Sequence, residues 1–450
     1  MLDSVVVHTF LRMWAFTHIV HFLRRSSSID PSGWILMAAA CAVLVAPSRS
    51  YLVAFLAIVD VLSVLAAGMY VDNHAIIMMF GNLVILVNLI QRRRLESALA
   101  TIRWTTLIAY GAAAFAKLNA AFFDPVTSCT TDFIGRYTRL AADWFNVDII
   151  APLGFLAAMP YTIAMAELAV VPLLAVRRTR HLAVLLIIPL HLSMSVNPYG
   201  TGSTFTILVL TVAFLFMSRD AQRSVASITS SLAGALVASP VRQGLTFVIL
   251  WATLVWIRSW GRSVPWLTPT TAVPNHTLIT AATLLVIGVL VVAIARSRSI
   301  SGSTLPWRPP SAHTPLIALV VVHALSPYLG LSTVPVFTMY SNLRTEADLH
   351  NHFIVPPAPW STTQASLVQV ISTTNPELVV LAASEEWLTL HETRRRVNRW
   401  PEASLEYLLN GEARLHTPQT RDPVLERANL LLEFFIHHRT VPIGRSICQW

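Results

Sequence analysis

Eleven apolar runs, separated by short gaps, follow one another up to about residue 331 and constrain the fold more than any other feature. They cover residues 5–23, 33–48, 51–70, 75–91, 98–118, 155–176, 181–196, 202–217, 243–257, 277–295 and 314–331. A helix that crosses a membrane needs about 20 mostly apolar residues, and several runs are shorter, so we expect about nine to eleven membrane helices.

Composition supports this class of protein. Of the 450 residues, 54% are hydrophobic and only 12% are charged. Such values are typical of a polytopic membrane protein and exclude an ordinary soluble domain. The sequence therefore predicts an all-α polytopic membrane protein, with residues 1–332 as its helical membrane domain.

Arginine clusters lie in alternate gaps between the runs, at 91–96, 177–180, 219–223 and 296–299. The positive-inside rule places such clusters in the cytoplasm, so the region after about residue 332 is predicted to lie outside. We expect a multi-pass protein of the cell membrane, in contact with the lipid bilayer. Because nearly all of the net charge of +9 comes from arginines in such clusters, we do not expect nucleic-acid binding.

Residues 333–450 have a more polar composition and are predicted to form a small α+β extracytoplasmic appendage. The segments "HFIVP", "SLVQVIST" and "PELVVLAAS" favour strands, whereas "EEWLTLHETRRRVNRW" and "DPVLERANLLLEFFIHHR" favour amphipathic helices. Cys129 and Cys448 would both lie outside and could form a disulfide, but the sequence does not fix their pairing.

Several polar residues interrupt or flank the apolar runs, and the predicted topology places them on the outer side of the membrane. They are Asn73, His74, Lys117, Asn119, His191, Tyr340, Asn342, Arg344 and Glu346. If the helices bring them together, they form an outward-facing pocket in which a desolvated lysine can act as a general base.

Each group also has a structural interpretation, which the sequence leaves open. Lys117 can extend to the lipid headgroups, and His191 can be a hydrogen-bonded contact between helices. Asn73 can cap a helix that starts at His74. Arg344 with Glu346 can form a surface ion pair.

Other polar features point away from known site types. Asp60 and Glu167, near mid-membrane, are expected to form structural hydrogen bonds or to be neutral acids. The sequence has no phosphate-binding loop, CxxC or HExxH motif. The tract "HNH" at 350–352 is interpreted as a turn, and no metal is expected.

Four segments resemble the horizontally transferred transmembrane (HTTM) family, the bacterial branch related to vitamin K-dependent gamma-carboxylase. They are "AAFAKLNAAFF", "DNHAIIMMFG", "RRTRHLAVLLIIPLHLSMSV" and "FTMYSNLRTEADLHNHFIVP". The opening "DSVVVHTFLRMWAF" resembles the first helix of the family. The resemblance covers roughly residues 1–356, in the same order and spacing.

The resemblance implies an enzyme, a carbon–carbon lyase that oxygenates reduced vitamin K or another quinone with O2. The alkoxide so formed removes a γ-proton from glutamate, and the carbanion captures CO2. Lys117, His74 and His191 match the catalytic lysine and pocket histidines, and Tyr340–Arg344 matches the tract near the glutamate site. Asn73, Asn119 and Glu346 are expected to complete the pocket.

The expected partner is a secreted peptide or protein substrate. Two alternatives stay open. The chain could be a non-enzymatic membrane protein for maturation or export of a secreted peptide, or a transporter with the same helix bundle. The few helix-breaking residues inside the runs disfavour a transporter.

Overall fold

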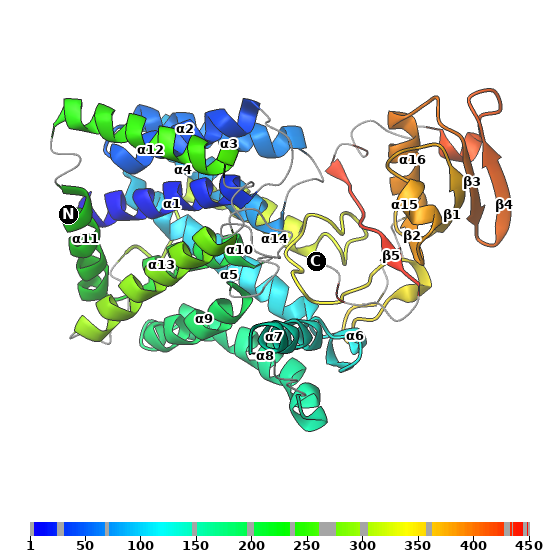
Figure 1. Ribbon diagram of the computed structural model, residues 1–450, viewed down its shortest axis with the longest axis horizontal. Coiled ribbons are helices and arrows are strands. Elements are labelled where there is room, and N and C mark those ends of the chain that lie inside the picture. Colours follow the sequence, from blue (N-terminus) through cyan, green and yellow to red (C-terminus); the bar gives the residue numbers. More distant parts are fainter. Residues whose placement is uncertain are drawn as a thin grey trace.

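A computed structural model of the chain describes residues 4–24, 31–67, 72–145, 151–195, 202–234, 239–260, 276–297, 305–356, 362–426, 433, 435–443 and 448. A helix bundle forms one end of the molecule and a small sheet the other (Figure 1). Each of the eleven apolar runs contains a helix. These helices are α1 (Ser4–Arg24), α2 (Pro31–Val45), α3 (Ser50–Ala67), α4 (Asn73–Ile90), α5 (Leu95–Ala116), α8 (Leu153–Ala175), α9 (Arg180–Ser195), α10 (Ser203–Ala213), α12 (Pro240–Trp260), α13 (His276–Arg296) and α14 (Thr314–Leu325).

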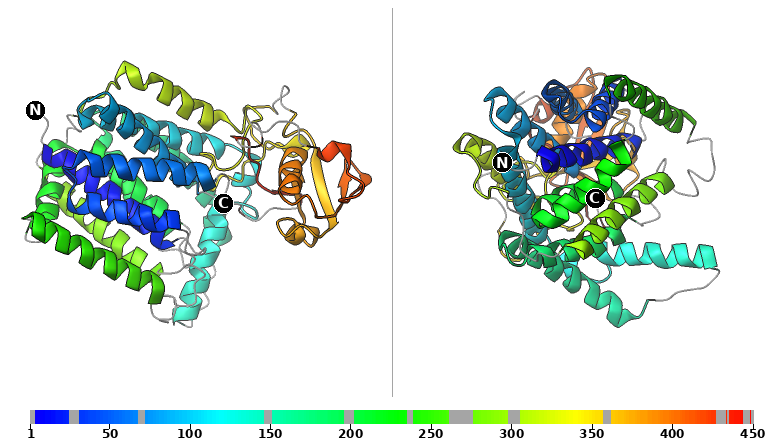
Figure 2. Two further views of the ribbon diagram at one scale, coloured as in Figure 1. Left: turned by 90° about the horizontal axis from the view of Figure 1, so that it is seen from above. Right: turned by 90° about the vertical axis from the view of Figure 1, so that its left-hand side faces the viewer.

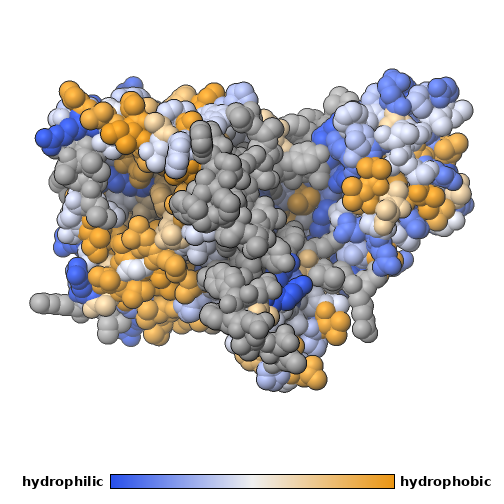
Figure 3. Space-filling model, in the orientation of Figure 1, coloured by the Kyte–Doolittle hydropathy of each residue, from blue (hydrophilic) through white to orange (hydrophobic). Residues whose placement is uncertain are grey.

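Five helices among the described residues are long and apolar enough to cross a membrane: α3, α4, α8, α12 and α13. The apolar helices α2, α9, α10 and α14 are shorter. Large apolar side chains face outward on the bundle, such as Val241, which is 81% exposed, whereas the C-terminal region is more hydrophilic (Figure 3). These features indicate a helical membrane protein, and the number of crossings stays a prediction.

Helix α10 lies inside the bundle, where all its residues are buried, and packs against α1, α9 and α13. It continues into a 3-10 helix, Phe214–Phe216. The last carbonyls of a helix have no partner within it. Arg103 of α5 supplies a partner here, because its Nε donates to the carbonyl of Leu215 at 2.9 Å. Its Nη1 donates to the carbonyl of Leu305 at 3.2 Å.

Two helices outside the apolar runs are α7 (Cys129–Phe145) and α11 (Arg219–Gly234). Both helices are amphipathic, so neither contains an apolar run from which the sequence could predict it. They lie across the bundle axis rather than along it (Figure 2). α11, which carries the 219–223 arginine cluster, lies at the end of the bundle opposite the C-terminal region (Figure 1).

The C-terminal region holds a five-stranded antiparallel sheet in the order β4-β3-β1-β2-β5. Its elements are β1 (Leu367–Thr373), α15 (Val379–Ala382), β2 (Glu386–Thr389), α16 (Leu390–Arg399), β3 (Leu405–Leu409), β4 (Glu412–His416) and β5 (Val441–Pro442). Val368, Leu388 and Tyr407 form part of its core. Asn410 and Gly411 join β3 to β4 with φ of 52° and 84°, the conformation that a tight hairpin turn requires.

Several predictions for this region are wrong. Residues 376–384 contain helix α15 instead of a strand, and 385–400 begin with strand β2 before α16. Val368 pairs with Leu388, and this pairing overrides the helical pattern. Residues 352–356 form a loop, in which His352 makes an isolated bridge with Asn119.

The predicted helix at 422–439 is confirmed only at Glu433 and Phe435 among the residues that the structure describes. The segment begins instead with a 3-10 turn, Pro423–Leu425, and residues 436–439 are irregular. Residues 427–432 and 434 lie outside the described residues. A disulfide joins Cys129, at the start of α7, to Cys448. It resolves the pairing that the sequence left open and ties α7 to the end of the chain.

Candidate functional site

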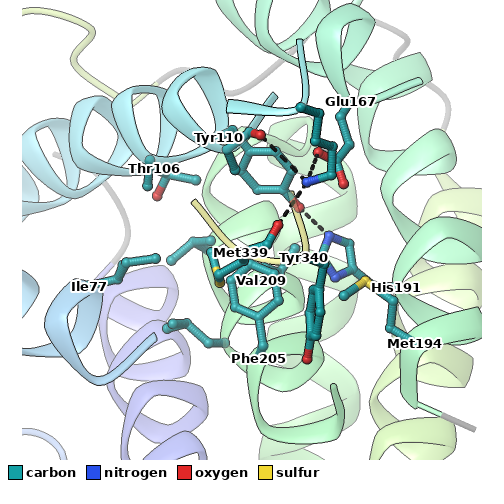
Figure 4. A pocket seen from close by; sticks show the side chains of 15 residues that line it. Ile77, Thr106, Tyr110, Glu167, His191, Met194, Phe205, Val209, Met339 and Tyr340 are labelled. Atoms are coloured by element: carbon teal, nitrogen blue, oxygen red, sulfur yellow. Dashed lines mark hydrogen bonds and ion pairs between the residues drawn. The ribbon is translucent and has the colours of Figure 1, made fainter. Parts of the chain in front are cut away.

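Lys117 follows the last residue of α5 and turns into the protein, where it is 3% exposed. Its Nζ lies 2.8 Å from Oε2 of Glu167 on α8 and donates to the carbonyl of Met339 at 2.9 Å (Figure 4). Lys117 therefore does not extend to the headgroups. Two oppositely charged side chains share one buried site, so neither charge is left uncompensated.

Tyr110 and His191 form a second polar pair beside Lys117. The hydroxyl of Tyr110 lies 2.5 Å from Nε2 of His191, which α9 supplies. Tyr110 precedes Lys117 by two helical turns and therefore lies on the same face of α5. Nδ1 of His191 is buried without a hydrogen-bond partner among the described residues. His191 is thus both a contact between α5 and α9 and a polar group available in the pocket.

Two cavities meet at the lysine. The smaller measures about 30 Å³, contains Tyr110 and His191, and has mostly apolar walls, which include Phe205 and Val209 (Figure 4). The larger measures about 230 Å³ and lies among α7, α8 and α9. Four residues line both: Lys117, Glu167, Met194 and Tyr340. The ion pair therefore lines both cavities.

Tyr340 comes from the loop after α14 and has a φ of 52°. This left-handed conformation is uncommon for a bulky residue. Its ring lies against Phe133 of α7, with centroids 5.1 Å apart. The carbonyl of the preceding residue, Met339, accepts from Lys117. The 339–341 segment thus fixes the ammonium and closes one side of both cavities.

His74 is not in the lining of this pocket. Its ring lies beside His21 of α1, with Nε2 2.9 Å from Nδ1 of His21. Phe205 contacts both His74 and His191, with centroid distances of 6.5 Å and 5.1 Å. The predicted trio of His74, Lys117 and His191 is therefore only partly brought together. Ile77, one turn after His74, reaches the pocket instead.

Three predicted pocket asparagines have structural roles. Asn73 accepts from the backbone N–H of Val336 at 3.0 Å and is the first residue of α4, so it does not cap that helix. Asn119 caps the short helix α6 (Ala120–Phe123) through Phe122 N–H. Asn342 accepts from the Cys129 N–H at 2.9 Å. These contacts hold the loops around Lys117 in place.

Arg344 and Glu346 lie at the junction with the C-terminal region. Glu346 is buried, and its Oε1 is 3.7 Å from Nε of Arg439. Its Oε2 accepts from the Thr345 N–H at 2.8 Å. Arg344 is half-buried, and its N–H donates to Asn351. Neither residue lines the lysine pocket. The surface ion pair is therefore the wrong interpretation for buried Glu346.

Tyr110 and Glu167, the pocket residues that pair with His191 and Lys117, were not predicted as site residues. A tyrosine two turns from a lysine is a weak signal, and nothing in the sequence pairs Glu167 with Lys117. For Asp60 the prediction is confirmed, since Oδ2 accepts from the Asn82 side chain at 2.7 Å. The "HNH" tract is a loop whose Asn351 donates to Asn119.

Comparisons of the chain with protein-family models, curated proteins and solved structures found no match. Fold and site together define a helical membrane protein with a buried lysine–glutamate pair between two cavities. The relationship to the HTTM family stays a prediction from the sequence motifs.

Proposed function

We propose that this protein is an integral membrane enzyme of the vitamin K-dependent gamma-carboxylase type, in which Lys117 acts on a reduced quinone. One observation carries the proposal. Lys117 is the only lysine among 450 residues, and it lies buried beside Glu167 in an apolar pocket. A general preference for arginine explains why the rest of the sequence contains no lysine, but it does not explain why position 117 is a lysine.

An amine offers chemistry that arginine cannot. Guanidinium stays protonated, whereas a buried ammonium readily gives up its proton. Transfer of that proton to Glu167, 2.8 Å away, leaves a neutral amine that can accept a proton from a hydroxyl. The ammonium so formed then stabilises the resulting oxyanion. Reduced quinone and O2, when bound, would supply the strong base that the HTTM resemblance implies.

The larger cavity is the better place for the quinone. Its walls include Phe133 and Ile134 of α7 and Leu190 of α9, and small-molecule sites of about 300–1,000 Å³ are typically lined by such apolar groups. Its volume of about 230 Å³ lies below that range, so a bound quinone would have to displace part of the cavity wall, for which we propose the amphipathic helix α7. A lipophilic molecule could then reach Lys117 from the lipid, where water is excluded.

The Cys129–Cys448 disulfide supports an outer location for this end of the molecule, because disulfides persist in oxidising compartments. A peptide substrate, with CO2 as the second reactant, would then approach from the side of the C-terminal region. Tyr340 lines both cavities and is placed to separate such a substrate from the quinone.

Quinone epoxidation tests the proposal. Membranes with the wild-type protein, supplied with reduced vitamin K or other reduced quinones, O2 and bicarbonate, should form the epoxide. Lys117→Ala and Lys117→Arg should each reduce its rate by about 10²–10⁴-fold, because neither side chain can act as a base. Glu412→Gln, an exposed change in the β3–β4 hairpin, is the control and should keep full activity.

A full rate in Lys117→Arg would show that charge alone suffices and would contradict the base role. No epoxide from folded wild-type protein would favour the non-enzymatic alternative. That alternative predicts that peptide maturation survives Lys117→Ala but not deletion of residues 357–450. Because there is one lysine, isotope-labelled lysine gives a single side-chain NMR signal, which should shift when a quinone binds.

A further inference from the structure

A second cluster lies where the C-terminal end of α1 meets the N-terminal end of α4. His21 and His74 are each 4% exposed, and their Nδ1 and Nε2 atoms are 2.9 Å apart. Oδ2 of Asp72 lies 3.6 Å from the same Nε2 of His74. One ligand atom from each residue falls within 4.8 Å of the other two.

We propose that His21, His74 and Asp72 bind a divalent transition-metal ion. Two imidazoles and one carboxylate are a donor set that proteins use for Zn²⁺ and for non-haem Fe²⁺, with further positions left for water. Ligand bonds of about 2.0–2.2 Å place the donors of one ion about 3–4 Å apart. The two distances that involve His74, 2.9 and 3.6 Å, lie in or next to that range.

The surroundings allow an ion to enter. Asp72 is half-exposed, with 47% of its side chain accessible, so it connects the two buried histidines to solvent. Arg24 competes for the same carboxylate, with its Nη1 3.8 Å from Oδ2 of Asp72. Nη1 also donates to Thr204 at 3.0 Å and can keep that partner when Asp72 turns toward an ion.

This site is separate from the lysine pocket. Phe205 lies between His74 and His191, and the three ligands do not line either cavity at Lys117. A bound ion would fasten α1 to α4 at this end of the bundle. The proposal does not depend on the proposed function. It replaces the prediction that the protein binds no metal. The sequence did not indicate this site, because His21 and His74 are 53 residues apart and form no recognisable motif.

Zinc binding by the full-length, tag-free protein in detergent tests the assignment. After treatment with a chelator and dialysis, the wild-type protein should bind one Zn²⁺ per chain in a calorimetric titration, and zinc should raise its thermal midpoint. His74→Ala should abolish binding. Asp72→Asn keeps the size of a half-exposed side chain and should lower the affinity about tenfold or more, the scale of losses at metal sites.

His181→Asn is the matched control, a partly exposed histidine of α9 outside the cluster. It should keep wild-type affinity, and the midpoint of Asp72→Asn without zinc should equal that of the wild type. A hydrogen bond between two histidines without a metal is the competing explanation. No zinc bound by folded wild-type protein, or wild-type zinc affinity in either Asp72→Asn or His74→Ala, would overturn the assignment.

Discussion

At Lys117 the chain leaves helix α5, and the side chain turns inward because its partners lie there. Glu167 comes from α8 and the Met339 carbonyl from the loop after α14. A buried ion pair has a large desolvation cost, which its mutual attraction only partly offsets. The ion pair is therefore weak evidence for a stabilising role and stronger evidence for a chemical role.

Removal of one member of this pair should cost more than removal of both. Lys117→Ala or Glu167→Ala alone leaves one buried charge uncompensated and should destabilise the protein by about 3–5 kcal/mol. The double variant should be more stable than either single variant. Unfolding in one detergent, followed by tryptophan fluorescence, measures this.

Glu412→Ala is the control for that series. Glu412 pairs with Arg414 at the surface, so its removal should change the free energy of unfolding only slightly. Additive losses in the double variant would mean that the two residues do not interact.

At the scale of elements, the C-terminal sheet is attached to the bundle through buried polar contacts. His438 lies between Thr389, at the end of β2, and the carbonyl of Leu331, with contacts of 2.6 Å and 2.5 Å. A carbonyl only accepts, so Nε2 carries the proton and Nδ1 accepts from the Thr389 hydroxyl. Nδ1 can accept only while the ring is neutral, whereas Nε2 can donate to Leu331 in either protonation state.

The stability of this junction should decrease in acid. Burial lowers the pKa of His438 to about 4, whereas an unfolded histidine has a pKa of about 6.5. Between these values the unfolded chain binds the extra proton, so stability is complete above about pH 6.5 and declines toward pH 4. The loss from this group should be on the order of 2–3 kcal/mol.

Thermal unfolding of wild type and His438→Gln across that pH range measures the effect. His391 and Glu392 face the same ring and stay in both proteins. His438→Gln should be less stable than the wild type near neutral pH, and its stability should depend less on pH. An unchanged slope would assign the acid sensitivity to other groups.

At the scale of the whole molecule, the two ends differ in chemistry. One end carries α11 with its arginines, and the other carries the sheet (Figure 1). The Cys129–Cys448 disulfide joins α7 to the end of the chain. Helices with exposed apolar side chains lie between the two ends. Which end lies outside stays a prediction from the arginine clusters.

The three cysteines provide a test of that orientation. In protein purified without reductant, Cys129 and Cys448 should not react with a maleimide after denaturation, whereas Cys41, buried and free, should react. Mass spectrometry should then detect one label per chain, and three after reduction. Three labels without reductant, in protein trapped directly from cells, would contradict both the disulfide and the outer location.

The sequence by itself determined the class of protein and the position of the apolar helices, because hydrophobicity is a local property of each run. It also identified Lys117 and His191 as unusual. It could not pair Lys117 with Glu167 or Tyr110 with His191, since such contacts depend on how distant helices pack.

Only the tertiary structure determined which residues contact His74 and that residues 386–389 form strand β2. His74 had a role assigned by resemblance, yet the packing of α4 on α1 places it beside His21. Residues 386–389 follow a helical pattern but pair with β1, because a strand is stabilised by its neighbour in space rather than by its own sequence. Buried polar groups are satisfied in the same way, by partners that only the completed fold supplies.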